Sequence, residues 1–126
     1  MLLDSNIIIY AVQPEHTFLR AFILAQGPAV SAVSYVEVLG YHQLSEQDRQ
    51  DFEDFFAVAA VLPISSAVLD RAVQLRQLRR ITLGDALVAG TALVHGLTLV
   101  TRNTHDFTWI SELKLLNPFE QEQIGQ

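Results

Sequence analysis

One acidic residue, Asp4, stands in an otherwise apolar segment, MLLDSNIIIY, and no basic residue is near it in the sequence. Burying a carboxylate without a partner costs free energy. Three further acids, Glu37, Asp85 and Asp106, also lie beside segments expected to form buried strands or the helices next to them. Carboxylates that converge without arginines raise one another's pKa, and a divalent cation would relieve their repulsion.

The chemistry suited to such a cluster is hydrolysis of a phosphodiester bond. The chain has no cysteine, and its histidines show no ligand spacing, so an all-oxygen site for Mg²⁺ or Mn²⁺ is favoured. A metal-activated water would attack the phosphorus in line, and the metal would neutralise charge on the phosphate oxygens. If the four acids converge, they are therefore candidate metal ligands and catalytic residues.

Each acid also has a purely structural interpretation. Ser34-x-x-Glu37 and Thr82-x-x-Asp85 match the capping box, in which an acid in the first helical turn bonds backbone N–H groups. Asp106 fits a turn, where aspartate is common. Asp4 is the hardest to explain in this way, because its neighbours are apolar. Residue types alone leave both interpretations open.

The elements around the four acids decide whether they meet. Strands are expected at Leu2-Leu3 and over 29–33, 61–64, 97–101 and 113–117, and helices over 16–26, 34–44, 45–60, 66–80 and 82–96. This alternation predicts an α/β fold whose mainly parallel sheet is covered by helices on both faces. Helices that leave or re-enter parallel strands begin at the carboxyl edge of the sheet, so all four acids are expected there.

Composition narrows the remaining classes of protein. The length of 126 residues predicts a single domain over residues 1–126. The apolar runs are shorter than the roughly 18 residues of a membrane span, and Asp4 interrupts any signal peptide, so we expect no membrane partner. The lack of cysteine fits the cytoplasm, and the 50% hydrophobic content suggests an oligomeric surface. The net charge of −6 argues against a basic nucleic-acid footprint, unless bound cations reverse the local potential.

Four segments, LLDSNIIIY, SYVEVLGY, LGDALVAGTAL and LVTRNTHDF, followed by LKLLNPF, carry a family resemblance nearly from end to end. The chain resembles the PIN-domain ribonucleases, and most closely the VapC-type toxins of bacterial toxin–antitoxin pairs. The resemblance implies a PIN-like three-layer sandwich with a central five-stranded parallel sheet. Strands one and four would be adjacent in its middle.

The same resemblance implies roles for individual residues. It makes Asp4, Glu37, Asp85 and Asp106 the acidic quartet that holds Mg²⁺ or Mn²⁺. It places Ser5, Asn6, Thr101 and Asn103 where the family has polar residues that support the site or face the phosphate, and Arg102, beside the site, is a candidate for phosphate contact. An endoribonuclease of structured RNA is implied, together with a homodimer and a small antitoxin whose tail occupies the active-site groove.

Three other functions can be compared with this one by the residues that each of them needs. A haloacid-dehalogenase-like phosphatase needs a second acid two positions after the first, where Asn6 stands. A phosphoacceptor receiver domain needs a lysine late in the sheet, and the only lysine, Lys114, is poorly placed. A non-catalytic or stand-alone PIN-fold module that acts through protein binding stays open.

Three arginines form a separate feature of the sequence. Arg76, Arg79 and Arg80 have i, i+3 and i+4 spacing and are expected to share one helix face. That face could contact RNA phosphates. The favoured interpretation is a solvated face, perhaps paired with the acids of residues 46–54.

Overall fold

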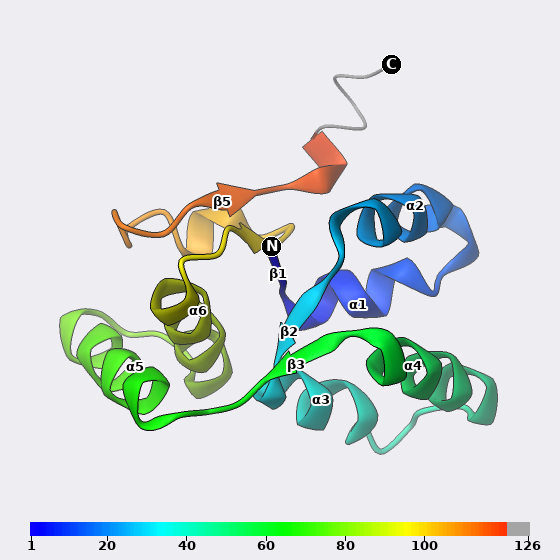
Figure 1. Ribbon diagram of the computed structural model, residues 1–126, viewed down its shortest axis with the longest axis horizontal. Coiled ribbons are helices and arrows are strands. Elements are labelled where there is room, and N and C mark those ends of the chain that lie inside the picture. Colours follow the sequence, from blue (N-terminus) through cyan, green and yellow to red (C-terminus); the bar gives the residue numbers. More distant parts are fainter. Residues whose placement is uncertain (121–126) are drawn as a thin grey trace.

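The chain forms one parallel sheet with helices packed on both of its faces (Figure 1). The structure is a computed structural model that describes residues 1–120, so residues 121–126 of the expected domain lie outside the described residues. The sheet has five strands in the order β3-β2-β1-β4-β5, and every pairing is parallel. The strands are β1 (Leu2–Leu3), β2 (Ala29–Ser31), β3 (Ala60–Leu62), β4 (Leu99–Val100) and β5 (Leu115–Leu116). The predicted α/β fold, with the first and fourth strands adjacent in the middle, is confirmed.

The helices in residues 1–120 are α1 (Ser5–Ala11), η1 (Pro14–His16), α2 (Thr17–Gln26), α3 (Ala32–Leu39), α4 (Glu46–Val58), α5 (Ser66–Leu78), α6 (Leu83–His95) and η2 (Thr104–Asp106), where η marks a 3-10 helix. Five of them, α1, α3, α4, α5 and α6, begin at a side chain that caps them. Ser45, Ser65 and Thr82 each accept a hydrogen bond from the backbone N–H three residues on, at the starts of α4, α5 and α6. Gly27 and Gly96 end α2 and α6 in the left-handed conformation, which costs glycine no steric strain.

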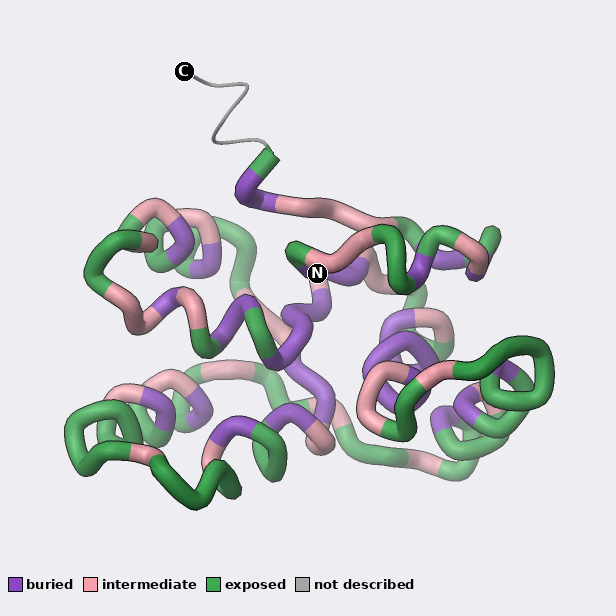
Figure 2. The backbone as a smooth tube through the Cα atoms, turned by 180° about the vertical axis from the view of Figure 1, so that it is seen from behind, coloured by how far each residue is buried: buried purple, intermediate pink, exposed green. Residues whose placement is uncertain are grey.

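Alternate residues of the strands point to opposite faces of the sheet and contribute to a hydrophobic core on each face. Leu3, aligned with Val30 and Val100, packs among residues of α1, α2, α3 and α4. Leu2, aligned with Leu99, packs among residues of α5, α6 and the segment 107–113. The central strands β1, β2 and β4 are therefore buried on both sides, as Figure 2 shows along the centre of the molecule, whereas the edge strands β3 and β5 are more exposed.

Three layers follow from this packing. In Figure 1 the sheet runs between α5 and α6 on one side and the helices α1 to α4 on the other. The expected three-layer arrangement is confirmed for residues 1–120. No helix in that range combines the length and apolar character needed to cross a membrane.

Two sequence-based expectations about helix boundaries that concern the candidate functional residues are wrong. Helix α3 begins at Ala32, because Ser31 at the end of β2 caps it by accepting a hydrogen bond from the Val33 N–H. Ser34 is therefore inside the helix, and Glu37 is not the acid of a capping box. Helix α5 ends at Leu78, so Arg79 and Arg80 lie beyond it and do not share a helix face with Arg76.

Candidate active site

Asp4 lies at the carboxyl end of β1 and caps α1. Its Oδ1 accepts a hydrogen bond from the Ser5 N–H at 2.8 Å, and its Oδ2 accepts one from the Thr101 hydroxyl at 2.9 Å. The residue is only 6% exposed. Burial, together with the charges of Asp85 and Glu37, raises the pKa of Asp4 to about 6, although the two hydrogen bonds oppose the rise. No basic side chain of residues 1–120 forms an ion pair with this carboxylate.

Hydrogen bonds connect α1 to Glu37 on α3. The Ser5 hydroxyl lies 2.8 Å from Glu37 Oε1 and 2.8 Å from Ser34 Oγ. Because a hydroxyl carries one proton, Ser5 donates to the carboxylate and accepts from Ser34. Ser34 and Glu37 are three positions apart on α3 and so share a face, which is turned toward α1. The earlier start of α3 is what puts Ser34 into this arrangement.

The first turn of α6 lies against the same carboxylate. A Cβ on Gly84 would stand 2.7 Å from Glu37 Oε2, so the lack of a side chain at Gly84 makes room for Glu37. The Asp85 N–H donates to Thr82 Oγ1 at 3.2 Å, which confirms the predicted cap at this helix. The pKa of the Asp85 carboxyl is raised, chiefly by burial and then by the charges of Asp106 and Glu37, against a hydrogen bond with Thr82.

Asp106 lies in η2, beyond the end of β4, and its side chain is 49% exposed. Its Oδ1 lies 3.1 Å from His105 Nε2. Asp106 and Asp85 line the same cavity. The loop between β4 and η2 is held at its start, because the Asn103 N–H donates to Thr101 Oγ1 at 3.1 Å while the Thr101 hydroxyl donates to Asp4.

The four predicted acids thus gather at one edge of the sheet. The charges of Asp85 and Glu37 act on Asp4, and those of Asp106 and Glu37 act on Asp85. As the side chains stand, no three acidic or imidazole groups within residues 1–120 form a ready-made metal site. Their chemistry nonetheless fits Mg²⁺ or Mn²⁺, because all the donors are oxygens and the buried Asp4 has no cationic partner among those residues.

The remaining predicted residues differ in how closely they join this site. The hydroxyls of Ser5 and Thr101 donate hydrogen bonds to Glu37 and Asp4, respectively. The backbone N–H of Asn103 donates to the Thr101 hydroxyl. Asn6 is exposed on α1. The Arg102 guanidinium stacks on aromatic rings, 4.1 Å from the centroid of Phe119 and 5.2 Å from that of Tyr10.

Two structural features of the site are not among the sequence-based predictions. The sequence pattern indicates only a helix start at Ser34, although the i, i+3 spacing from Ser34 to Glu37 is a signal that the two side chains are partners. Gly84 precedes Asp85 in the first turn of α6, a place where glycine weakens a helix and so indicates a close approach.

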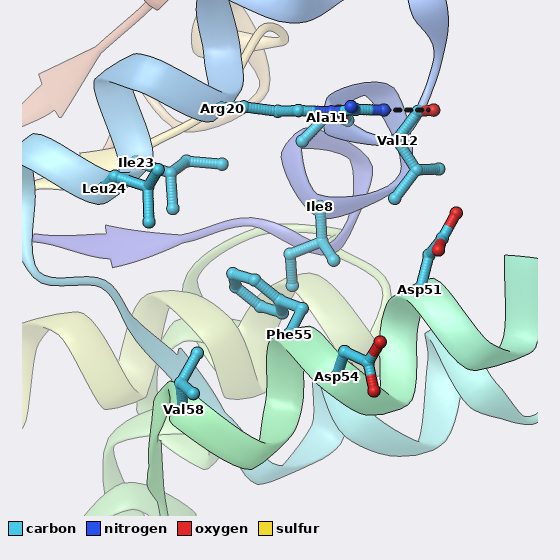
Figure 3. A pocket seen from close by; sticks show the side chains of 10 residues that line it. All are labelled: Ile8, Ala11, Val12, Arg20, Ile23, Leu24, Asp51, Asp54, Phe55 and Val58. Atoms are coloured by element: carbon cyan, nitrogen blue, oxygen red, sulfur yellow. Dashed lines mark hydrogen bonds between the residues drawn. The ribbon is translucent and has the colours of Figure 1, made fainter.

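Two of the cavities near the helices around this site bear on its function. One, of about 680 Å³, adjoins the acidic edge and is lined by Arg76, Arg79, Arg80, Ile81, Thr82, Asp85, His105, Asp106 and Trp109. The other, of about 360 Å³, is lined by α1, α2 and α4, mostly with apolar side chains (Figure 3). In Figure 3 Ile8, Ile23 and Phe55 gather around it, and Asp51 and Asp54 follow one another along α4.

Comparison with known proteins identifies the family. The family model of the PIN domain matches residues 1–112, and the chain belongs to the PIN domain family. Among its relatives, the tRNA(fMet)-specific endonuclease VapC of Shigella flexneri is 29% identical over 123 aligned positions, covering 90% of this chain and 93% of that protein. Ribonuclease VapC10 of Mycobacterium tuberculosis is 31% identical over 122 positions, covering 90% of each. The resemblance drawn from the sequence motifs is confirmed.

Solved structures agree with this assignment. A toxin–antitoxin complex from Klebsiella pneumoniae contains a chain 29% identical to this one, with a TM-score of 0.74 and coverage of 93% of this chain and 96% of that one. VapBC2 from Rickettsia felis, bound to a DNA fragment from its promoter, reaches a TM-score of 0.80 at 23% identity, with 92% and 96% coverage. The second similarity concerns the fold alone.

Proposed function

We propose that this chain is a Mg²⁺- or Mn²⁺-dependent endoribonuclease and the toxin of a VapBC-type toxin–antitoxin pair. The observation that carries the proposal is the gathering of four acids at one edge of the sheet. Hydrogen bonds from Thr101 and Ser5 hold Asp4 and Glu37 there, the first turn of α6 lies against Glu37, and Asp85 shares a cavity with Asp106. Relatives named as VapC ribonucleases support the same reaction. The cytoplasm, where RNA and ribosomes are present, is the compartment that fits it.

In this proposal the four acids hold the cation and water is the attacking group, so no side-chain nucleophile is needed. The cation would supply a Lewis acid that promotes ionisation of water and offsets charge on the phosphate. Ser5 and Thr101 keep Glu37 and Asp4 in place through hydrogen bonds. Such fixed carboxylates need little rearrangement during the reaction, which favours catalysis.

Asp85→Asn tests the catalytic proposal. Purified wild-type protein and the variant are incubated with labelled total RNA in Mg²⁺, in Mn²⁺ and in EDTA. We expect the wild type to cleave RNA in either metal but not in EDTA, and Asp85→Asn to be at least about 100-fold slower, because it loses a metal ligand. Asp70→Asn, the same change at an exposed position of α5, should cleave normally. Cleavage by Asp85→Asn at the wild-type rate would refute the assignment.

The partner we propose is a small antitoxin, as in the toxin–antitoxin complexes among the similar structures. The apolar cavity between α1, α2 and α4 offers a surface for an apolar segment of such a protein. Leu24 and Val58, both 79% exposed, lie at its rim. Asp51 and Asp54 line the same cavity, whereas Arg20, which also lines it, donates to the carbonyl oxygens of Ala11 and Val12, so the segment is expected to carry a basic residue as well.

A homodimer is the assembly we propose. Large apolar side chains are exposed on α3, on β3 with the loop after it, and on α5, namely Tyr35, Val36, Val61, Ile64, Leu69 and Val73. β3 is an edge strand, and unpaired edges with apolar side chains favour association. A non-catalytic protein-binding module would keep both surfaces and show no cleavage in the assay above.

A further inference from the structure

Three arginines beyond and at the end of α5 line a cavity that opens beside the acidic edge. Arg76 is in the last turn of α5, and Arg79 and Arg80 follow the helix. All three line the cavity of about 680 Å³, together with Asp85 and Asp106. Because α5 ends at Leu78, the chain turns here, and the arginines gather around a hollow instead of along a helix face.

These arginines have no acidic partner within residues 1–120. The ion pairs of arginine in that range join Arg49 to Glu46 and Arg71 to Glu112, so the acids of residues 46–54 do not pair with the three. The side chains of Arg76, Arg79 and Arg80 are exposed. Three of the eight basic residues of a chain with net charge −6 are thus concentrated in one hollow.

One wall of the cavity is fixed by Trp109. Its Nε1–H donates to the Asp106 carbonyl oxygen at 2.9 Å, which ties the indole to η2. The Arg79 guanidinium lies over the ring, 5.6 Å from its centroid. Stacking of this kind orients a guanidinium and leaves its N–H groups free to bind an anion.

The positive charge of the three arginines would attract a phosphate to this cavity. Each nucleotide of an RNA strand carries one negative charge, which the acidic quartet repels until a cation binds. Arginines beside the quartet offset that repulsion and give the strand a second point of attachment.

We propose that this cavity is a phosphate-binding subsite for the RNA strand that enters the acidic centre. Arg76, Arg79 and Arg80 bind backbone phosphates next to the scissile one, and Trp109 positions Arg79. This inference rests on the proposed ribonuclease function for the identity of the strand, while the anion site itself is defined by the arginines.

The test measures RNA binding separately from cleavage. Asp4→Asn serves as the background, and binding of a fluorescent 12-nucleotide single-stranded RNA is followed by anisotropy at several salt concentrations. Replacing all three arginines by alanine should weaken binding at least about 10-fold and reduce the salt slope by about 2, near 0.7 for each lost phosphate contact. Arg49→Ala on α4, a matched loss of one exposed arginine, should leave affinity and slope unchanged.

Further variants separate charge from structure. Lysine at positions 76, 79 and 80 should restore the salt slope, because it keeps the charges. Trp109→Phe retains an aromatic ring beside Arg79 and should weaken binding less than Arg79→Ala does. With the natural quartet intact, the triple alanine variant should raise KM for RNA and change kcat by less than about twofold, as expected for lost ground-state binding.

The outcomes distinguish this proposal from the proposed function. Unchanged affinity and salt slope in the triple variant would overturn the subsite, even if the wild type cleaves RNA. Arginine-dependent RNA binding without metal-dependent cleavage would support the subsite and refute the ribonuclease. Normal RNA binding by the triple variant, combined with lost binding of the antitoxin, would instead assign the arginines to a protein interface.

Discussion

At the scale of the residue, Asp4 is held where its own charge is unfavourable. Its carboxylate accepts hydrogen bonds from two donors, but it is buried and the charges of Asp85 and Glu37 act on it. Buried carboxylates with a raised pKa occur chiefly at functional sites, where a bound ligand compensates the free energy of burying the charge. The isoleucines that follow Asp4 fix it in place, because Ile7 and Ile8 anchor α1 in the hydrophobic core.

Asp4→Asn should stabilise the metal-free protein at alkaline pH. The pKa of Asp4 is raised from 3.8 to about 6, so the folded state holds its proton more tightly than the unfolded chain. Stability therefore falls as pH rises between these two values, and above about pH 6 the full cost, of order 3 kcal/mol, is present. The amide removes this cost, since it can accept from the Ser5 N–H and donate to Thr101.

The measurement is thermal unfolding in EDTA from pH 4 to pH 8. The melting temperature of Asp4→Asn should exceed that of the wild type at pH 8, and the difference should shrink toward pH 4. Asp70→Asn should show no such trend, because Asp70 is exposed on α5. A fall of several degrees at pH 8 in Asp4→Asn would show that the two hydrogen bonds outweigh the charge.

At the scale of the element, the site depends on where two helices begin. The cap at Ser31 starts α3 early enough to turn Ser34 and Glu37 toward α1. The cap at Thr82 starts α6 so that Gly84 faces Glu37 and Asp85 stands at the acidic edge. The N-terminal ends of helices also favour negative charge, which helps Asp85 to be tolerated in the first turn.

Gly84→Ala should impair catalysis and leave the fold intact. The added Cβ would lie 2.7 Å from Glu37 Oε2, and the carboxylate, at the end of a flexible side chain, would have to move. Alanine favours helix by up to about 1 kcal/mol over glycine, so stability should not fall. We expect the rate of RNA cleavage to decrease at least about 10-fold, with the melting temperature unchanged or higher.

A double-mutant cycle identifies the route of this effect. In a Glu37→Ala background the Gly84→Ala change should cause no additional loss of rate, since the group that it displaces is absent. An equal loss in both backgrounds would mean that Gly84 acts on something other than Glu37.

At the scale of the whole molecule, burial of both sheet faces leaves apolar side chains on the outer helices. The chain is 50% hydrophobic, and several large apolar side chains lie outside its buried clusters. The exposed groups on α3, β3 and α5 and those around the cavity of Figure 3 lie on different elements. They therefore offer room for two contacts, one with a second copy and one with an antitoxin.

Sedimentation velocity tests the homodimer. Wild-type protein at micromolar concentration should sediment as a dimer of the 14.1 kDa chain, and Val36→Glu combined with Leu69→Glu should shift it to monomer. Both side chains are at least half exposed, 66% and 50%, so the monomer should stay folded by circular dichroism. Monomeric wild-type protein would contradict the proposed assembly.

Co-purification tests the antitoxin surface. The chain is co-expressed with the product of the short reading frame immediately upstream, where a toxin–antitoxin pair would encode its antitoxin. Leu24→Asp should abolish the complex, because it puts a charge at the rim of the apolar cavity. Leu78→Asp, at a similarly exposed leucine on α5, should retain it. Retention by both variants would place the partner elsewhere.

By itself, the sequence determined the alternation of strands and helices, the caps at Ser45 and Thr82, and the helix ends at Gly27 and Gly96, because these depend on neighbouring residues. It left the cap of α5 between Ser65 and Ser66, and the structure shows Ser65. The motifs around Asp4, Glu37, Asp85 and Asp106 also identified the family correctly. The start of α3 does not follow from the sequence, since Ser31 and Ser34 are both good caps and local preference alone favours neither.

Only the tertiary structure decided what these residues contact. It brought Ser5 to Glu37, 32 positions away, and Thr101 to Asp4, 97 positions away, through the parallel pairing of β1 with β2 and β4. It also showed that Gly84 makes room for Glu37, and that the arginines near the end of α5 surround a cavity instead of covering a helix face. Contacts of this kind depend on how distant segments pack, which no local pattern in the sequence encodes.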